Sequence, residues 1–384
     1  MIDLKDKKIA IFSHDQEGTT GTDDEIVKYA LEKGCADLVN IKFPFIYSSD
    51  GAIRLKFIKN KKERQEKSWI KFYKPQSLAY LKDAILGFFY GLRYLRGCDL
   101  FFGMNNLLVF VGILLKKIGI VGKVIYYVID YTPVRYGNRF LNGLYYKLDE
   151  IALYGSDYVV SLNEAMLFGR VRDKGLDMKK INYAIAPFGN NSLSLEKKQR
   201  RHDKNSIVYF GRINKNKGSE LFVPIAKSLI NRGFGNFIFE IIGGGDVEYL
   251  RTEIKNNSLE RYFNLAGRID RQEDVDKLLL ECGVALAPYY PEDKNNFSYY
   301  SDPGKVKVYL GCGLPIVITN VPPIAKDVEK TGSGLIAEYN PDDFADKILK
   351  ILENYEFYEN NATKFGKEFD WNNIFDGLFN KIMQ

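Results

Sequence analysis

Short apolar runs alternate with amphipathic stretches along the first half of the chain. The runs KIAIF, ADLVNIKF, DLFFG, KVIYYVID and DYVVSL have the length and β-branched content of buried strands. The stretches between them have helical spacing, and strands that alternate with helices predict a parallel sheet covered on both faces. The clearest helical stripe occupies one face of a helix and consists of Leu81, Ile85, Phe88, Phe89, Leu92 and Leu95.

The alternation stops between residues 190 and 205, where the chain becomes polar and charged, and then resumes with SIVYF, NFIFEII, FNLAG, VALAPY and LPIVIT. We therefore predict an α/β protein with two doubly wound, Rossmann-like domains. The N-terminal domain is expected over residues 1–190, a linker over 191–204 and the C-terminal domain over 205–365. Residues 366–384 are expected to form a C-terminal helix that packs back on the N-terminal domain. Ligands of such sheets bind at the carboxyl ends of strands, so the cleft between the domains is the expected site.

Composition agrees with a two-domain globular protein, because 46% of the 384 residues are apolar and 27% are charged. The polar start, MIDLKDKK, has no secretory signal, and the apolar run 107–115 is about half the ~20 residues that a membrane span needs. We therefore expect a cytoplasmic protein. No metal site is expected. The four cysteines, Cys35, Cys98, Cys282 and Cys312, form no CxxC pair, and the chain has only two histidines, His14 and His202.

Charge is distributed unevenly. Residues 1–200 hold 32 basic and 22 acidic residues, whereas residues 201–384 hold 23 and 27. Nine cations and two acids lie between Arg54 and Lys74, interleaved with aromatic residues. This mixture suits an anionic membrane surface, although a solvated basic loop explains it as well. No nucleic-acid-binding motif accompanies the charge, so a nucleic-acid partner is not expected.

The stretch FGRINKNKG places two cations between two glycines at the end of a predicted strand. A diphosphate needs a bidentate donor, a point charge and nearby backbone N–H groups, and these residues can supply all three. If this stretch is considered alone, the simpler interpretation is a surface turn that carries cations by chance. The residues concerned are Gly211, Arg212, Lys217 and Gly218.

The following strand ends change that balance, because their order and spacing resemble glycosyltransferase family 4, the retaining enzymes with the GT-B fold. The family pattern GRxxxxKG matches residues 211–218 without gaps, and GxG matches residues 243–245. GxxxxxE resembles residues 267–273, and PxxKxxEYxAxGxPVV resembles residues 303–317. The likeness is strong over residues 186–350, and the first half is matched only in pattern.

The resemblance implies a role for residues of both halves. Arg212 and Lys217 would hold the diphosphate of a nucleotide-sugar donor and stabilise the leaving group. Asp130 would lie near the transferred sugar or the acceptor, although simple helix capping explains it equally well. His14 is placed to bind phosphate or sugar, and a hydrogen-bonded loop histidine is the alternative. Further donor contacts are implied for Gly18, Gly21, Gly211, Gly244, Gly267, Arg268, Ile269, Asp302 and Lys305.

One departure from the family concerns its two glutamates, the second of which binds the donor ribose. Tyr300 and Val308 occupy the matching positions. Valine accepts no hydrogen bond, so either Asp302 substitutes for the glutamate or the nucleotide is held differently.

The expected function is therefore a metal-independent, hexosyltransferase-like enzyme with no cofactor, acting in the synthesis of a cell-envelope polysaccharide or glycoconjugate. Its expected partners are a nucleotide-sugar donor and a glycan or lipid-linked acceptor. Two alternatives stay open: a GT-B-fold nucleotide-sugar epimerase or phosphorylase, and a non-catalytic nucleotide-sugar-binding module. A Rossmann dehydrogenase is disfavoured, because HDQEGTTGT lacks the GxGxxG spacing.

Overall fold

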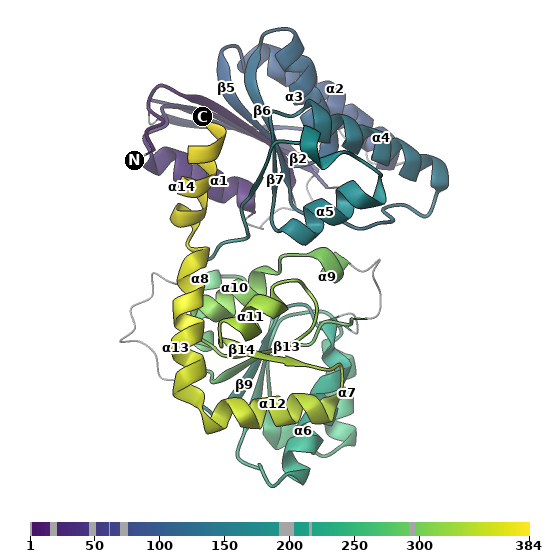
Figure 1. Ribbon diagram of the computed structural model, residues 1–384, viewed down its shortest axis with the longest axis vertical. Helices are drawn as coiled ribbons and strands as arrows, with labels where there is room; N and C mark the ends of the chain where they lie inside the picture. Colours follow the sequence, from purple (N-terminus) through teal and green to yellow (C-terminus); the bar gives the residue numbers. More distant parts are fainter. Residues whose placement is uncertain are drawn as a thin grey trace. The chain divides into compact units, whose positions relative to one another are not determined.

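The computed structural model describes residues 2–15, 21–45, 51–60, 62–69, 76–191, 203–214, 217–291 and 297–384. The chain divides into two compact units (Figure 1). Unit 1 comprises Met1–Ala186 together with Phe375–Gln384, and unit 2 comprises Pro187–Ile374.

Unit 1 is built on an eight-stranded sheet in the order β4-β3-β2-β1-β5-β6-β7-β8. Its strands are parallel except for β3 and β4, which form an antiparallel hairpin at one edge. Its elements are β1 (Lys8–Asp15), α1 (Thr22–Glu32), β2 (Asp37–Pro44), β3 (Ile53–Lys59), β4 (Lys62–Ser68), α2 (Gln76–Tyr94), β5 (Cys98–Gly103), α3 (Asn106–Lys117), β6 (Val121–Val128), α4 (Arg139–Gly155), β7 (Tyr158–Ser161), α5 (Glu164–Asp173), η1 (Met178–Lys180) and β8 (Tyr183–Ile185), with most of α14 (Trp371–Ile382).

Helices cover both faces of this sheet, as the alternating pattern predicted. Successive side chains of a strand point to opposite faces, and two neighbours on β5 show which helices lie on each. Phe101 packs against Phe12 and lies beside Gly112 of α3, whereas Phe102 faces Phe379 of α14 with ring centroids 5.8 Å apart. Helices α2, α3 and α4 accordingly lie together on one face, with α1 and α14 on the other (Figure 1).

Helix α2 confirms the predicted helix but turns its apolar stripe outward. The face that packs on the unit carries two glycines: a Cβ on Gly91 would lie 2.3 Å from Leu115, and one on Gly87 would touch Phe12 and Phe43. A residue larger than glycine at position 91 would require Leu115 to move, whereas a Cβ at position 87 would make ordinary van der Waals contact. The opposite face is exposed at Leu78, Leu81, Ile85, Phe89 and Leu92.

Unit 2 contains a fully parallel six-stranded sheet in the order β11-β10-β9-β12-β13-β14. Its elements are β9 (Ser206–Phe210), η5 (Ser219–Leu221), α6 (Phe222–Asn231), β10 (Ile238–Ile242), α7 (Val247–Asn256), η6 (Glu260–Tyr262), β11 (Phe263–Gly267), α8 (Gln272–Leu279), β12 (Val284–Ala287), α9 (Phe297–Tyr300), α10 (Gly304–Gly311), β13 (Ile316–Thr319), α11 (Ala325–Lys330), β14 (Gly334–Ala337), α12 (Pro341–Glu353), α13 (Tyr355–Gly366) and η7 (Lys367–Phe369).

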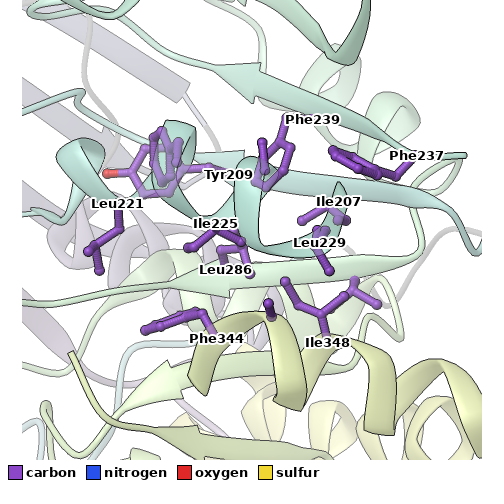
Figure 2. Packing of buried hydrophobic residues seen from close by; sticks show 14 of the residues in the cluster. Ile207, Tyr209, Leu221, Ile225, Leu229, Phe237, Phe239, Leu286, Phe344 and Ile348 are labelled. Atoms are coloured by element: carbon purple, nitrogen blue, oxygen red, sulfur yellow. The ribbon is translucent and has the colours of Figure 1, made fainter. Parts of the chain in front are cut away.

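The core of unit 2 forms two layers, one on each face of the sheet. Ile207 and Tyr209 of β9 point into the layer beneath α6 and α12, while Val208 between them points into the layer beneath α10 and α13. Figure 2 shows the first layer, in which Phe344 and Ile348 of α12 approach side chains of β9, β12 and α6. The predicted doubly wound α/β architecture is therefore confirmed.

The chain passes between the units at different residues from those expected. Residues 187–190 belong to unit 2, because Phe188 N–H donates to Asp302 Oδ2 (2.6 Å) and Asn190 N–H donates to the Phe369 carbonyl (2.9 Å). Most of the predicted linker, residues 192–202, lies outside the described residues. At the C-terminus, unit 2 extends to Ile374, and the following residues pack on Tyr29 of α1 within unit 1.

Candidate nucleotide-sugar site

Three loops at the carboxyl edge of the unit-2 sheet are joined by backbone hydrogen bonds. The loop after β9 donates from Gly211 N–H to the Ile242 carbonyl (2.9 Å) and from Ile213 N–H to the Gly244 carbonyl (2.8 Å). The loop after β10 in turn donates from Gly243 N–H to the Gly267 carbonyl (2.8 Å) at the end of β11. The glycine motifs of the sequence therefore meet in one place, where ligands of parallel sheets bind.

Two of these glycines are required by backbone contact. Gly243 has φ +149°, and a Cβ there would lie 1.9 Å from the Gly211 carbonyl oxygen. Gly218 has φ +76°, and its Cβ would lie 2.0 Å from the Pro288 carbonyl oxygen. Both positions combine a backbone conformation that favours glycine with a contact to rigid backbone. The loops can approach one another this closely only without side chains at these positions.

Two ammonium groups converge beside these loops on one buried tyrosine ring. Lys217 Nζ lies 5.0 Å from the ring centroid of Tyr289, and Lys305 Nζ lies 5.2 Å from the same centroid. Lys305 Nζ also lies 3.9 Å from the ring centroid of Tyr209. Lys217 donates a hydrogen bond to Ser298 Oγ (2.8 Å). A Cβ added to Gly211 would lie 3.2 Å from Lys305 Nζ, so this cation adjoins the predicted phosphate loop.

Neither ammonium group has a carboxylate partner within the described residues, and for Lys305 no described residue accepts a hydrogen bond. Burial, and secondly the nearby charge of Lys217, lower the pKa of Lys305 well below its ordinary value. Burial also lowers the pKa of Lys217. Two desolvated cations held together without an anion cost free energy. Such an arrangement is stabilised when an anion such as a diphosphate binds between them.

The two arginines predicted at this site are exposed. The described residues offer the Arg212 side chain neither an ion pair nor a hydrogen bond, and its backbone carbonyl accepts from Tyr209 Oη (2.8 Å). Arg268 pairs with Asp270 at 2.8 Å, with both side chains more than three-quarters exposed. Its Cβ lies 3.8 Å from the position that a Cβ on Gly244 would occupy. Arg212 is therefore free to reach an anion, whereas Arg268 lies beside the GxG loop.

Other predicted donor contacts have different surroundings. The carboxylate of Asp302 is buried and accepts from Lys307 Nζ (2.5 Å) and Phe188 N–H (2.6 Å), so both oxygens serve the interior of unit 2. Ile269 packs partly buried against the second core layer, and Gly267 has φ +70° with open space beside it. Val308 is buried in that same layer. The Asp302 carboxylate therefore has little exposed surface through which to contact a ribose.

Of the two N-terminal glycines predicted at the site, one is among the described residues. Gly18 lies outside the described residues. Gly21 is the N-cap of α1, and its N–H donates to Asp24 Oδ2 (3.1 Å). The local function of Gly21 is therefore to begin a helix.

His14 and Asp130 line one cavity of about 500 Å³ in unit 1. His14 is the penultimate residue of β1, and its ring nitrogens face Asp83 Oδ2 (3.1 Å) and the side-chain amide of Asn105 (2.7 Å). Asp130 follows β6 and accepts from Arg135 Nη1 (2.7 Å). Both residues thus lie at carboxyl ends of strands in the same sheet, and both are already hydrogen-bonded.

A buried ionic cluster beneath this cavity was not predicted. The Asp149 carboxylate is fully buried and contacts Arg170 Nη1 at 2.5 Å, Tyr126 Oη at 2.6 Å and Lys174 Nζ. Arg170 also donates to the Asp130 carbonyl (2.6 Å). The residues of this ionic cluster come from three separate elements, and no sequence motif connects them. Tyr209 and Tyr289 were missed for the same reason, and their only signal is that each flanks a strand end.

The described residues include no group of three or more histidine, cysteine, aspartate or glutamate side chains placed to hold a metal ion. Among the helices described, none combines the length and apolarity needed to cross a membrane.

Comparison with known proteins assigns this fold to the GT-B class, and residues 204–354 match the family model of glycosyl transferases group 1. That match covers most of unit 2 and includes Lys217 and Lys305. A search of curated proteins returns no match.

Solved structures with the same fold cover nearly the whole chain. They include HepE from Anabaena in complex with UDP (14% identity, TM-score 0.64), covering 98% of this chain and 99% of that one. A sucrose-phosphate synthase from Thermosynechococcus elongatus (16%, TM-score 0.69) and a glycosyltransferase from Rickettsia africae (14%, TM-score 0.70) show the same coverage of 98% and 99%. At these identities the likeness shows the fold.

Proposed function

We propose that the protein is a glycosyltransferase that moves a sugar from a nucleotide-diphosphate donor to an acceptor hydroxyl. The observation that carries this proposal is the pair of ammonium groups of Lys217 and Lys305, which converge on Tyr289 without a carboxylate partner among the described residues. They adjoin interlocked glycine loops at the carboxyl edge of a parallel sheet, where backbone N–H groups and fixed cations bind phosphate. The match of this unit to glycosyl transferases group 1 supports the same activity.

In the proposed reaction, the acceptor oxygen forms a bond to the anomeric carbon while the bond from that carbon to the donor diphosphate breaks. The hydroxyl proton passes to an oxygen of the departing diphosphate. Charge therefore grows on the diphosphate, and Lys217, Lys305 and the exposed Arg212 stabilise it. We propose hexosyl transfer with retention at the anomeric carbon, in keeping with family 4. We also propose that no metal ion is needed, because fixed cations supply the charge stabilisation.

The proposal is tested by incubating the full chain with a panel of UDP-, GDP- and CMP-linked sugars and measuring release of the nucleotide. UDP-linked sugars are the first choice, because the similar HepE structure contains UDP. Release of the nucleotide without formation of a 2-epimer is expected. A non-catalytic binding module would show binding without release, and an epimerase would convert the sugar; either result would contradict sugar transfer.

We further propose that the reaction takes place in the cytoplasm and contributes to a cell-envelope polysaccharide or glycoconjugate. The support is the charge and apolar character of unit 1. No second function is favoured by a separate observation.

Donor binding is expected to weaken as the pH rises. Burial lowers the pKa of Lys305 and Lys217 in the free protein, so these groups lose their protons below the ordinary pH range of lysine. The bound diphosphate stabilises the protonated forms, so binding above the lowered pKa takes up protons. Affinity then falls by up to about tenfold per pH unit for each lysine that takes up a proton. Calorimetric titration of UDP at pH 9 in two buffers of different ionisation enthalpy measures this uptake. Proton release on binding would contradict the assignment.

We also propose that unit 1 contacts an anionic membrane through the β3–β4 hairpin. The described part of the basic segment, Arg54–Lys74, forms this hairpin. Residue 61 and residues 70–74 lie outside the described residues. Glu63 and Glu66 pair with Lys56 (3.0 Å) and Arg64 (2.6 Å), which leaves a cationic excess on the exposed strand β4. Trp69 follows it with 59% of its surface exposed. Cations beside an exposed indole suit lipid headgroups.

Replacing Lys59, Lys62 and Lys67 by glutamine is expected to weaken cosedimentation with phosphatidylserine-containing vesicles by about 100-fold at low salt, since each cation contributes about 1 kcal/mol near such a surface. The matched control replaces the exposed lysines of unit 2, Lys227, Lys255 and Lys326, and should sediment like the wild type. Equal behaviour of the two triple variants would show that the hairpin has no special role.

A further inference from the structure

The cavity of unit 1 has a wall that is polar in one part and apolar in another. His14, Asn105 and Asp130 come from the carboxyl ends of the adjacent strands β1, β5 and β6. Much of the apolar part comes from two helices, with Leu78 and Leu81 on α2 and with Phe140, Leu141, Leu144 and Leu148 on α4. Its volume of about 500 Å³ lies within the range of small-molecule sites.

The apolar part is continuous with an exposed apolar surface. Leu78 and Leu81 line the cavity and are 45% and 53% exposed, while Phe140 and Leu144 across the opening are 79% and 51% exposed. The apolar stripe then continues along α2 away from the cavity. A surface helix of a globular protein normally buries such a stripe, and a contiguous exposed one marks a binding surface. The cavity therefore opens onto surface that favours hydrocarbon.

The buried wall of the cavity holds a polar atom without a partner. Arg170 lines the cavity with only 1% of its surface exposed, and its Nε has no hydrogen-bond partner among the described residues. Buried donors in native proteins are nearly always paired. This donor is enclosed by protein atoms, so the arginine contributes a fixed positive charge at the cavity wall.

We propose that this cavity binds the sugar acceptor and that the acceptor is an amphiphile. Its hydroxyl-bearing head lies against the strand ends at His14 and Asp130, and its hydrocarbon chain lies between α2 and α4. A free glycan would leave the leucine side chains of both helices in water, whereas an alkyl chain removes apolar surface on both partners from water. The assignment rests on the proposed function, because an acceptor is required only if a sugar is transferred.

The test measures binding of alkyl glucosides to the full chain by calorimetry, below their micellar concentrations and without any donor. Octyl, decyl and dodecyl β-D-glucoside are expected to bind with dissociation constants that fall about fourfold for each added methylene. Glucose alone is expected not to bind detectably. Absence of binding, binding that is independent of chain length, or equally tight binding of glucose would overturn the assignment.

Two matched pairs of variants separate the cavity from the general apolar surface. Leu81→Gln with Leu144→Gln changes the cavity wall and is expected to weaken dodecyl glucoside binding at least tenfold. Ile85→Gln with Phe89→Gln changes residues of 49% and 60% exposure on the same apolar stripe, outside the cavity, and should leave binding unchanged. All four side chains are at least 49% exposed and glutamine favours helix, so both proteins should fold. Equal weakening by the two pairs would indicate adsorption to the surface and would overturn the assignment.

The donor site provides an independent control. Lys305→Met should abolish most sugar transfer while leaving the dissociation constant of dodecyl glucoside unchanged. If no nucleotide sugar is turned over but the cavity binds the alkyl glucosides with the expected chain-length dependence, the proposed function fails and the amphiphile site stands. If sugar is transferred but no alkyl glucoside binds, the amphiphile assignment alone fails.

Discussion

Replacing Lys305 or Lys217 by methionine is expected to lower the rate of nucleotide release from the donor by about 100- to 1,000-fold, the usual effect of removing one charge-stabilising donor from an active site. Methionine keeps most of the aliphatic stem and removes the charge. The loss should appear mainly in kcat, because negative charge on the diphosphate grows as the bond to the sugar breaks.

The thermal stability of the Lys305→Met variant should change in the opposite direction to its turnover. In the free protein the two ammonium groups are desolvated and close to one another, which the lowered pKa of Lys305 reflects. Removing one of them relieves this cost, so the midpoint of thermal unfolding should rise in Lys305→Met while turnover falls. A residue that only maintains structure would lower both quantities.

The matched control is Lys326→Met on α11, which removes an exposed lysine from the same unit and should change neither turnover nor stability. Turnover within threefold of the wild type in both Lys217→Met and Lys305→Met would remove the basis for placing the donor diphosphate at these residues.

Replacing Asp149 by alanine is expected to lower the free energy of unfolding by about 3–5 kcal/mol, the cost of removing one partner from a buried ion pair. Asp149 has no solvent exposure and faces Arg170, Lys174 and the Tyr126 hydroxyl. Its removal leaves buried cations without a counter-charge. Urea unfolding followed by circular dichroism measures the change.

The neighbouring residue provides the control. Glu150 pairs with Lys147 at 2.9 Å on the exposed side of α4, and Glu150→Ala should cost at most about 1 kcal/mol. Because Arg170 also bonds to the Asp130 carbonyl, Asp149→Ala should in addition disturb the cavity wall. An effect no larger than that of Glu150→Ala would show that the buried cluster is not an important source of stability.

Periodicity predicted the helix α2 but not which of its faces is buried. Apolar residues at helical spacing normally point inward. Here Gly91 on the opposite face approaches Leu115 more closely than a Cβ would permit, and Gly87 on the same face lies beside Phe12 and Phe43. Which face of a helix packs depends on the shape of what lies beneath it, and that shape comes from residues distant in the sequence.

Motif spacing, in contrast, was informative at the candidate donor site. Gly211, Lys217, Gly244 and Gly267 follow strands that are neighbours in the sheet, so their order along the chain places them at one edge. Asp302 shows where this reasoning stops, because its position in the motif suggested a ligand contact while its side chain bonds to Lys307 and Phe188.

The sequence by itself determined the alternating α/β architecture and the positions of the glycine loops, because strand and helix periods, glycine positions and cation spacing are local properties of the chain. Only the tertiary structure decided the convergence of Lys217 and Lys305 on Tyr289, the buried Asp149 cluster and the apolar cavity between α2 and α4. Each of these joins residues from elements far apart in the sequence. Their contacts follow from how sheet and helices pack, which no local pattern encodes.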